Sequence, residues 1–115
     1  MFFSPEQVEA IVRDYRSAGL PPEEVALLAF AEKVAIDASR IVPGDIEELR
    51  RHGFSDADVL DIAMTAGARS FFSKVLDAVG AEPDARYETL EHGLRQTLTV
   101  GRPTGTGIAD PEKTP

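Results

Sequence analysis

The chain has 115 residues, a formal net charge of -8 and no cysteine. This length suits one domain with a modest hydrophobic core, and the lack of cysteine excludes disulfides, thiol redox pairs and thiolate metal ligands. The acidic balance disfavours binding to nucleic acid or to an anionic membrane surface, because both need clustered Lys and Arg. No segment resembles a secretory signal or a membrane span, so we expect a soluble, cytoplasmic protein.

The first two helices are indicated by strong start signals. Ser4 and Gln7 form a capping box around Pro5, which occupies the first helical position, and Gly19 ends this helix. A second helix begins at residues 21–24, where two prolines precede two glutamates that favour the positive end of a helix dipole. Its apolar side chains continue to residue 35, and residues 37–44 break it.

The third predicted helix is short and the fourth is long. Residues 45–52 form the third, which ends before Gly53. Acidic residues after Ser55 then cap a helix over residues 59–79. Because apolar residues run around most of its circumference, we expect this helix to be central in the fold, or partly buried by another subunit. Gly67 costs about 1 kcal/mol relative to alanine within a helix, which indicates a packing reason for it.

The last periodic segment predicts a fifth helix over residues 84–98, with Tyr87, Leu90 and Leu94 aligned on one face. Residues 101–115 are rich in Gly, Pro and Thr and predict a flexible tail. The expected architecture is therefore all-α, with one compact domain of about five helices over residues 1–100 and a tail over residues 101–115.

The long fourth helix also predicts assembly. Its apolar surface exceeds what four short helices can cover, so we expect a homo-oligomer. The candidate interface residues are Met64, Phe71 and Phe72, and the two phenylalanines could equally belong to the core. A dimer, a trimer and a hexamer all remain open.

Three segments resemble the carboxymuconolactone decarboxylase and alkylhydroperoxidase D superfamily, most closely the C-terminal half of its peroxidase-related branch. They are LLAFAEK (27–33), GFSDADVLDI (53–62) and FFSKVLDAVG (71–80), and the likeness covers roughly residues 5–82. The resemblance implies an all-helical fold that assembles into dimers, trimers or hexamers, with an active site among packed helices.

Peroxidase members of that superfamily carry a glutamate and then a Cys-x-x-Cys-x-x-x-His motif ahead of a glycine. One thiolate attacks the peroxide and the second thiol resolves the sulfenic acid. Alignment on Gly53 without gaps places the two cysteines on Ala38 and Ile41, the histidine on Asp45 and the glutamate on Ala26. None of these four residues can perform the corresponding role, which favours a protein without thiol peroxidase activity.

The resemblance leaves an acid–base site open, because the superfamily's decarboxylases act without a cysteine pair. The candidate set is His52 with Asp45 or Glu48; alternatively, His52 is simply stabilised at a helix C-terminus. Arg69 is a candidate for substrate or anion binding, or for an ion pair with a carboxylate such as Glu32 or Asp61. We expect no metal, since two isolated histidines lack ligand spacing, and no cofactor.

Two classes of function follow from these patterns. The chain is either a cysteine-free enzyme-family member or a helical module for binding or oligomerisation that retains the scaffold without its catalysis. It could also be the rear half of a peroxidase-related enzyme whose cysteine motif lies in a preceding half. The sequence identifies no substrate or small-molecule ligand.

Overall fold

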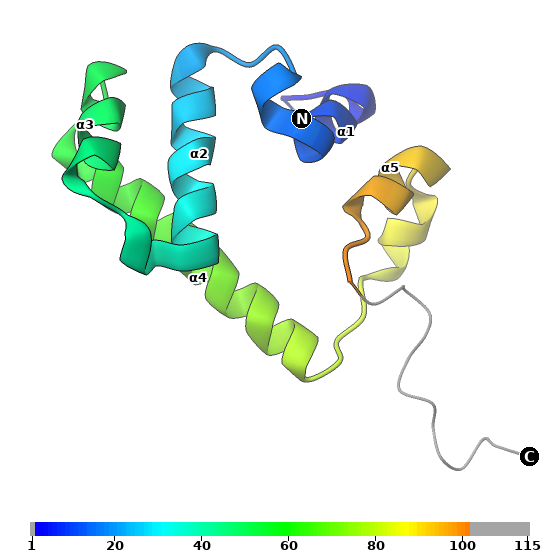
Figure 1. Ribbon diagram of the computed structural model, residues 1–115. Coiled ribbons are helices and arrows are strands. Elements are labelled where there is room, and N and C mark those ends of the chain that lie inside the picture. Colours follow the sequence, from blue (N-terminus) through cyan, green and yellow to red (C-terminus); the bar gives the residue numbers. More distant parts are fainter. Residues whose placement is uncertain (1, 102–115) are drawn as a thin grey trace, which may run out of the picture. The chain divides into compact units, whose positions relative to one another are not determined.

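The computed structural model describes residues 2–101, and every regular element within them is helical, which confirms the all-α prediction. The predicted tail lies outside the described residues, apart from Gly101. Among the described residues, no helix combines the length and the apolar character needed to cross a membrane. The chain divides into two compact units (Figure 1), which we call the middle unit (residues 19–75) and the terminal unit (residues 2–18 and 76–101).

The helices lie close to their predicted positions. The five α-helices are α1 (Pro5–Asp14), α2 (Pro22–Asp37), α3 (Pro43–Arg51), α4 (Asp56–Ala78) and α5 (His92–Leu98), and the short 3₁₀ helices are η1 (Tyr15–Ser17), η2 (Ala38–Arg40) and η3 (Ala85–Thr89).

Local capping explains why α1 and α4 begin where they do. Ser4 Oγ accepts a hydrogen bond from the Gln7 backbone N–H at 3.2 Å, and Gln7 Oε1 accepts one from the Ser4 N–H at 2.8 Å, as the capping-box prediction required. Ser55 and Asp58 form the same reciprocal pair, at 2.8 and 3.1 Å, at the start of α4. These bonds satisfy backbone donors that the first helical turn leaves unpaired.

The α3 helix begins two residues earlier than predicted. Pro43 takes the first helical position, where its missing N–H is not needed. The Asp45 carboxylate accepts a hydrogen bond from the Val42 N–H at 2.8 Å, which fixes the turn that enters the helix. Gly53 then separates α3 from α4 with φ of 92°, a left-handed conformation that favours glycine.

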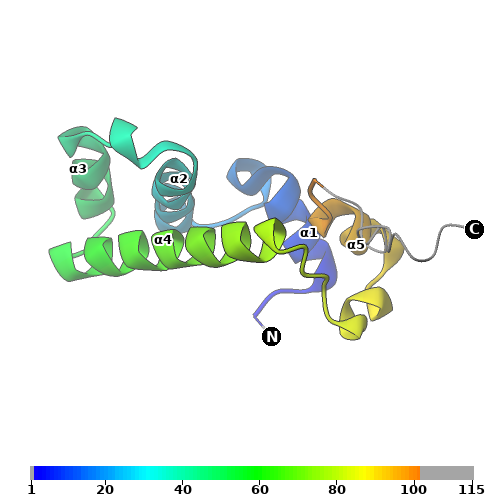
Figure 2. The same cartoon turned by 90° about the horizontal axis from the view of Figure 1, so that it is seen from below.

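Three buried side chains form the core of the middle unit. Phe30 of α2, Leu49 of α3 and Val59 of α4 pack together, and Leu49 is only 1% exposed. Figure 2 shows α2 and α3 on the same side of α4. The partly buried apolar residues around this core are Ala26, Val34, Ile41, Ile46, Phe54, Ile62 and Ala63.

The terminal unit is built by α1 and α5, which contact each other, and contains the buried Leu94. The prediction of one continuous helix over residues 84–98 is wrong. The segment forms η3, then an extended step at Leu90 and Glu91, then α5. The break lets the Tyr87 hydroxyl donate a hydrogen bond to the Arg95 carbonyl at 3.0 Å. In an unbroken helix these residues would stand about 12 Å apart along the axis.

Replacing the most buried leucine should destabilise the chain strongly. We expect Leu49→Ala to lower the free energy of unfolding by about 2–5 kcal/mol, because it leaves a cavity between α2, α3 and α4. The matched control is Leu76→Ala, at a side chain that is 47% exposed, where the loss should stay below about 1 kcal/mol. Urea denaturation of both variants measures the difference, and equal losses would contradict the described core.

Candidate functional site

The C-terminal turn of α3 brings together two of the predicted acid–base residues. His52 caps the helix, and its Nε2 lies 3.2 Å from Oε1 of Glu48, one turn earlier. Glu48 also accepts hydrogen bonds from the Arg51 guanidinium. Arg51 first, and His52 second, lower the pKa of the Glu48 carboxyl below its ordinary value. A carboxylate held in its ionised form in this way is a poor proton donor near neutral pH.

The third acid–base candidate, Asp45, is not part of this cluster. Its carboxylate accepts a hydrogen bond from Lys33 Nζ of α2 at 2.8 Å and caps the Val42 N–H. The Lys33 hydrogen bond is the larger cause, and the Val42 hydrogen bond the second, of the lowered pKa of Asp45. Seven residues of helix place Asp45 about 10 Å from His52 along the axis. Asp45 therefore joins α2 to α3.

The remaining charged groups near α3 also have structural partners. Arg50 bonds Oδ1 of Asp56 through Nε at 3.0 Å and Nη2 at 2.8 Å, and it also pairs with Glu47. This arrangement ties the end of α3 to the start of α4. Among residues 2–101, no three His, Asp or Glu side chains gather closely enough to hold a metal ion.

Arg69 lies exposed on α4, and the predicted ion pair with Glu32 or Asp61 does not form. Within residues 2–101 its guanidinium has no hydrogen bond or salt bridge. Asp61 lies eight residues earlier, about 12 Å from Arg69 along the helix axis, and Arg69 stands about 200° around the axis from Phe71. Its role as an anion-binding residue stays a prediction.

One whole side of α4 is apolar and exposed. Met64 is 63% exposed, Phe71 66% and Phe72 61%, and the two phenylalanine rings meet edge to face with centroids 6.3 Å apart. Within the middle unit, α2 and α3 pack on one side of α4, and the expectation that this helix is central or partly buried by another subunit stays a prediction. Phe71 and Phe72 are not core residues.

Helical geometry places Met64 and Phe71 on one face with other residues that were not singled out, whereas Phe72 lies about 100° further around the axis. Leu60, Met64, Gly67 and Phe71 recur at spacings of four, three and four residues, which places them along one face. Leu60 is 59% exposed and Val75, one turn beyond Phe71, is 44% exposed. We call the face formed by Leu60, Met64, Gly67, Phe71 and Val75 the open α4 face. Its spacing was visible in the sequence, but which side α2 and α3 would cover was not.

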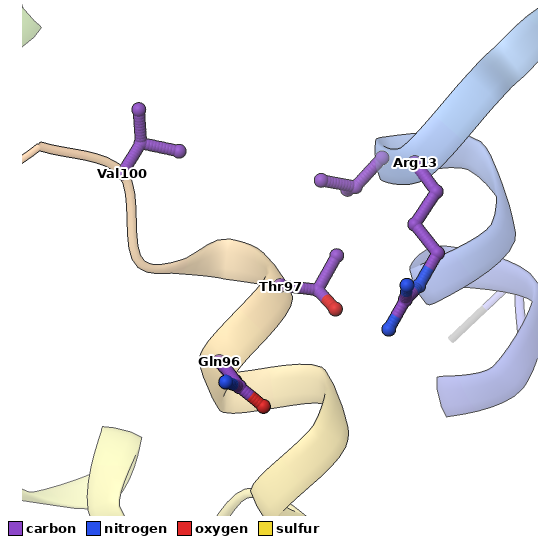
Figure 3. A pocket seen from close by; sticks show the side chains of 5 residues that line it. Arg13, Gln96, Thr97 and Val100 are labelled. Carbon is purple, nitrogen blue, oxygen red and sulfur yellow. The ribbon is translucent and has the colours of Figure 1, made fainter.

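The terminal unit has an open hollow of about 490 Å³ between α1 and α5, lined by Val12, Arg13, Gln96, Thr97 and Val100 (Figure 3). Arg13 is already paired with Glu9, at 2.7 Å, and Thr97 Oγ1 donates to the Gly93 carbonyl at 2.9 Å. The hollow therefore offers little acid–base chemistry. Sequence reasoning missed it because its residues come from both ends of the chain.

Comparison with known protein families, with curated proteins and with solved structures finds no match for this chain.

The Lys33–Asp45 contact predicts a specific pH dependence. A carboxyl whose pKa is lowered by folding contributes stability above its unfolded value of about 4, and this stability is lost as the pH falls through the lower folded value. Asp45→Asn should therefore lower the urea midpoint at about pH 7 and match the parent chain at about pH 2. The control is Asp77→Asn, at an exposed carboxylate. An unchanged midpoint at neutral pH would contradict the assigned role.

Proposed function

We propose that this chain is a cytoplasmic helical self-association module, similar to the alkylhydroperoxidase D and carboxymuconolactone decarboxylase superfamily but without thiol peroxidase chemistry. It forms homo-oligomers and binds neither nucleic acid nor membranes. The proposal rests chiefly on one observation, which is the exposure of the open α4 face.

Exposing an apolar face of this kind to water is unfavourable in free energy for a monomeric protein. Soluble monomers rarely expose large contiguous apolar patches, and such patches typically mark interaction sites. From Leu60 to Val75 the open α4 face runs about 22 Å along the helix. Each large side chain that leaves water on association contributes about 1.5–3 kcal/mol if fully buried. Burial of this face by a second copy therefore offsets part of the free-energy cost of association.

The proposed absence of thiol chemistry is supported by the residues at the four positions that the resemblance aligns with the catalytic residues of the peroxidases. Ala38 and Ile41 are the ends of the η2 turn, where the Ile41 N–H donates to the Ala38 carbonyl at 3.2 Å. Neither side chain can react with a peroxide. Asp45 is engaged by Lys33, and Ala26 packs against the core of the middle unit. The positions that carry chemistry in the peroxidases serve packing and helix geometry here.

A second candidate function is acid–base catalysis at the end of α3. The observation that favours it is the 3.2 Å contact between His52 and Glu48. It has less support, because Glu48 is exposed and is held by Arg51 as well. If this candidate is right, His52→Gln abolishes whatever lactone or carboxylate chemistry the parent chain shows, while the urea midpoint and the oligomeric state stay unchanged.

Placing a charge on the open α4 face should break the assembly. Met64→Glu introduces a carboxylate where a partner must exclude water, so we expect at least about tenfold weaker association, or about 1.4 kcal/mol. Multi-angle light scattering over a dilution series should show a mass above 12.4 kDa for the parent chain and a mass near that value for the variant.

The matched control is Thr65→Glu, the same charge on the next residue, about 100° around the helix. Thr65 is also exposed, so neither variant should disturb the fold, and far-ultraviolet circular dichroism checks this. A parent chain that stays at 12.4 kDa at all micromolar concentrations would refute self-association. Equal losses in both variants would show that the open α4 face is not the contact surface.

The chain should not reduce hydroperoxides with thiols. With an alkyl hydroperoxide and a dithiol reductant, we expect consumption at the rate of the reductant alone, since the chain has no cysteine to form a sulfenic acid. The assay follows loss of hydroperoxide at several protein concentrations. Consumption that rises in proportion to the protein would overturn the proposed loss of peroxidase function.

A further inference from the structure

Gly67 has no packing partner among residues 2–101. A Cβ atom built on this glycine meets nothing within 4 Å, although glycine in a helix costs about 1 kcal/mol relative to alanine. Neither a left-handed backbone nor a close contact in the described part of the chain explains the glycine. A small residue in the middle of an apolar face allows a large side chain of another helix to approach closely.

The spacing on the open α4 face matches that of paired helices. Leu60, Met64, Gly67 and Phe71 follow the alternation of four and three residues that keeps one seam against a partner helix. The next position of this series is Lys74, which is exposed. A single lysine at such a position costs stability and specifies how the two helices align.

The charges along α4 distinguish the two possible directions of the partner. The first part of the helix carries Asp56, Asp58 and Asp61, whereas the later part carries Arg69, Lys74 and Asp77. By helical spacing Asp56 and Lys74 lie on the side of the open α4 face, whereas Asp58 and Arg69 lie on the opposite side. In a parallel pair, Lys74 would face Lys74 of the other copy, and the acidic first turns of the two helices would face each other. The two helix dipoles would also point in the same direction. Each of these arrangements is repulsive. An antiparallel pair sets the basic part of one helix against the acidic start of the other.

We infer, on the basis of the proposed self-association, that two copies of this chain pair through their open α4 faces in antiparallel direction, with the twofold axis between Thr65 and Ala66. In this register Leu60 of each copy lies level with Phe71 of the other, and Met64 lies over Gly67 of the other. Lys74 comes level with Ala57 of the other copy, next to Asp56, which lies one turn before Leu60 on the same side of α4.

Shifts of one heptad leave a poorer match. A shift in one direction sets Met64 level with Lys74 of the partner copy, which buries a charge against a thioether. The opposite shift moves Phe71 level with residue 53, which precedes the start of α4. Only the register given above matches the apolar positions with one another and brings Lys74 to the acidic turn.

Single cysteines test this arrangement cleanly, because the chain has none of its own. We expect Leu60→Cys and Phe71→Cys to give a disulfide-linked pair under mild oxidation only when the two variants are mixed. In the antiparallel pair, two copies of position 60 stand about 16 Å apart along the axis, beyond the roughly 4.4–6.8 Å between Cα atoms that a disulfide requires. Mass spectrometry identifies the product, and Arg69→Cys mixed with either variant should remain unlinked.

The outcomes separate this inference from the proposed function on which it rests. Strong homodisulfides from Leu60→Cys alone would show a parallel pair and overturn the antiparallel arrangement while leaving self-association intact. Light scattering of the reduced variants and of the parent chain reports self-association independently. A parent chain that is monomeric there would refute the proposed function itself, and the arrangement with it.

A charge reversal provides a second readout that leaves the apolar side chains untouched. Lys74→Glu should weaken pairing about tenfold or more, because the new carboxylate lies next to Asp56 of the partner copy. The control Arg69→Glu makes the same charge change away from the open α4 face and should have a much smaller effect. In a parallel pair, position 74 faces position 74 of the other copy, so Lys74→Glu replaces a contact between two lysines with one between two glutamates. The dissociation constant would then stay unchanged, and this result would contradict the antiparallel register.

Discussion

The packing of α4 is the constraint on which the rest of the structure depends: α4 has more apolar surface than α2 and α3 cover. This helix carries large apolar side chains on more than one side, and the middle unit covers one side with α2 and α3. The covered side holds Val59 against Phe30 and Leu49, and this cluster explains how the three helices stay together. The other side is exposed in the described part of the chain. The hydrophobic effect acts on both sides, and this is the basis of the proposed association with a second copy.

The charged residues of the middle unit mainly stabilise its helix junctions. Asp45 joins α2 to α3 through Lys33, Arg50 joins α3 to the start of α4 through Asp56, and Ser55 with Asp58 caps α4. The contact of Glu48 with His52 lies at the surface and shares its carboxylate with Arg51. These pairs are exposed or partly exposed, and each contributes modestly to stability. The acidic and basic groups that looked catalytic in the sequence thus have structural explanations.

Most of the local structure could be predicted from the sequence because its causes are local. Capping at Ser4 and at Ser55, and the left-handed Gly19, Gly53 and Gly80, involve residues within a turn of one another. The break before α5 could not be predicted in this way. It is accompanied by a hydrogen bond from the Tyr87 hydroxyl to the Arg95 carbonyl, eight residues further along the chain, which no local pattern shows. The side of α4 that becomes buried could not be predicted locally either, because it depends on where α2 and α3 pack. The periodicity showed that α4 is apolar on several sides without showing which side stays open.

The accessibility of Met64 in solution tests the central claim most directly. A dilute oxidant converts exposed thioethers to sulfoxides, and the rate at Met64 can be followed by mass spectrometry at increasing protein concentration, with free methionine as the reference. Coverage of the open α4 face by a second copy predicts fast oxidation in dilute samples and marked protection in concentrated ones, with the change near the concentration at which the mass doubles. Oxidation at the same rate at every concentration would contradict the account.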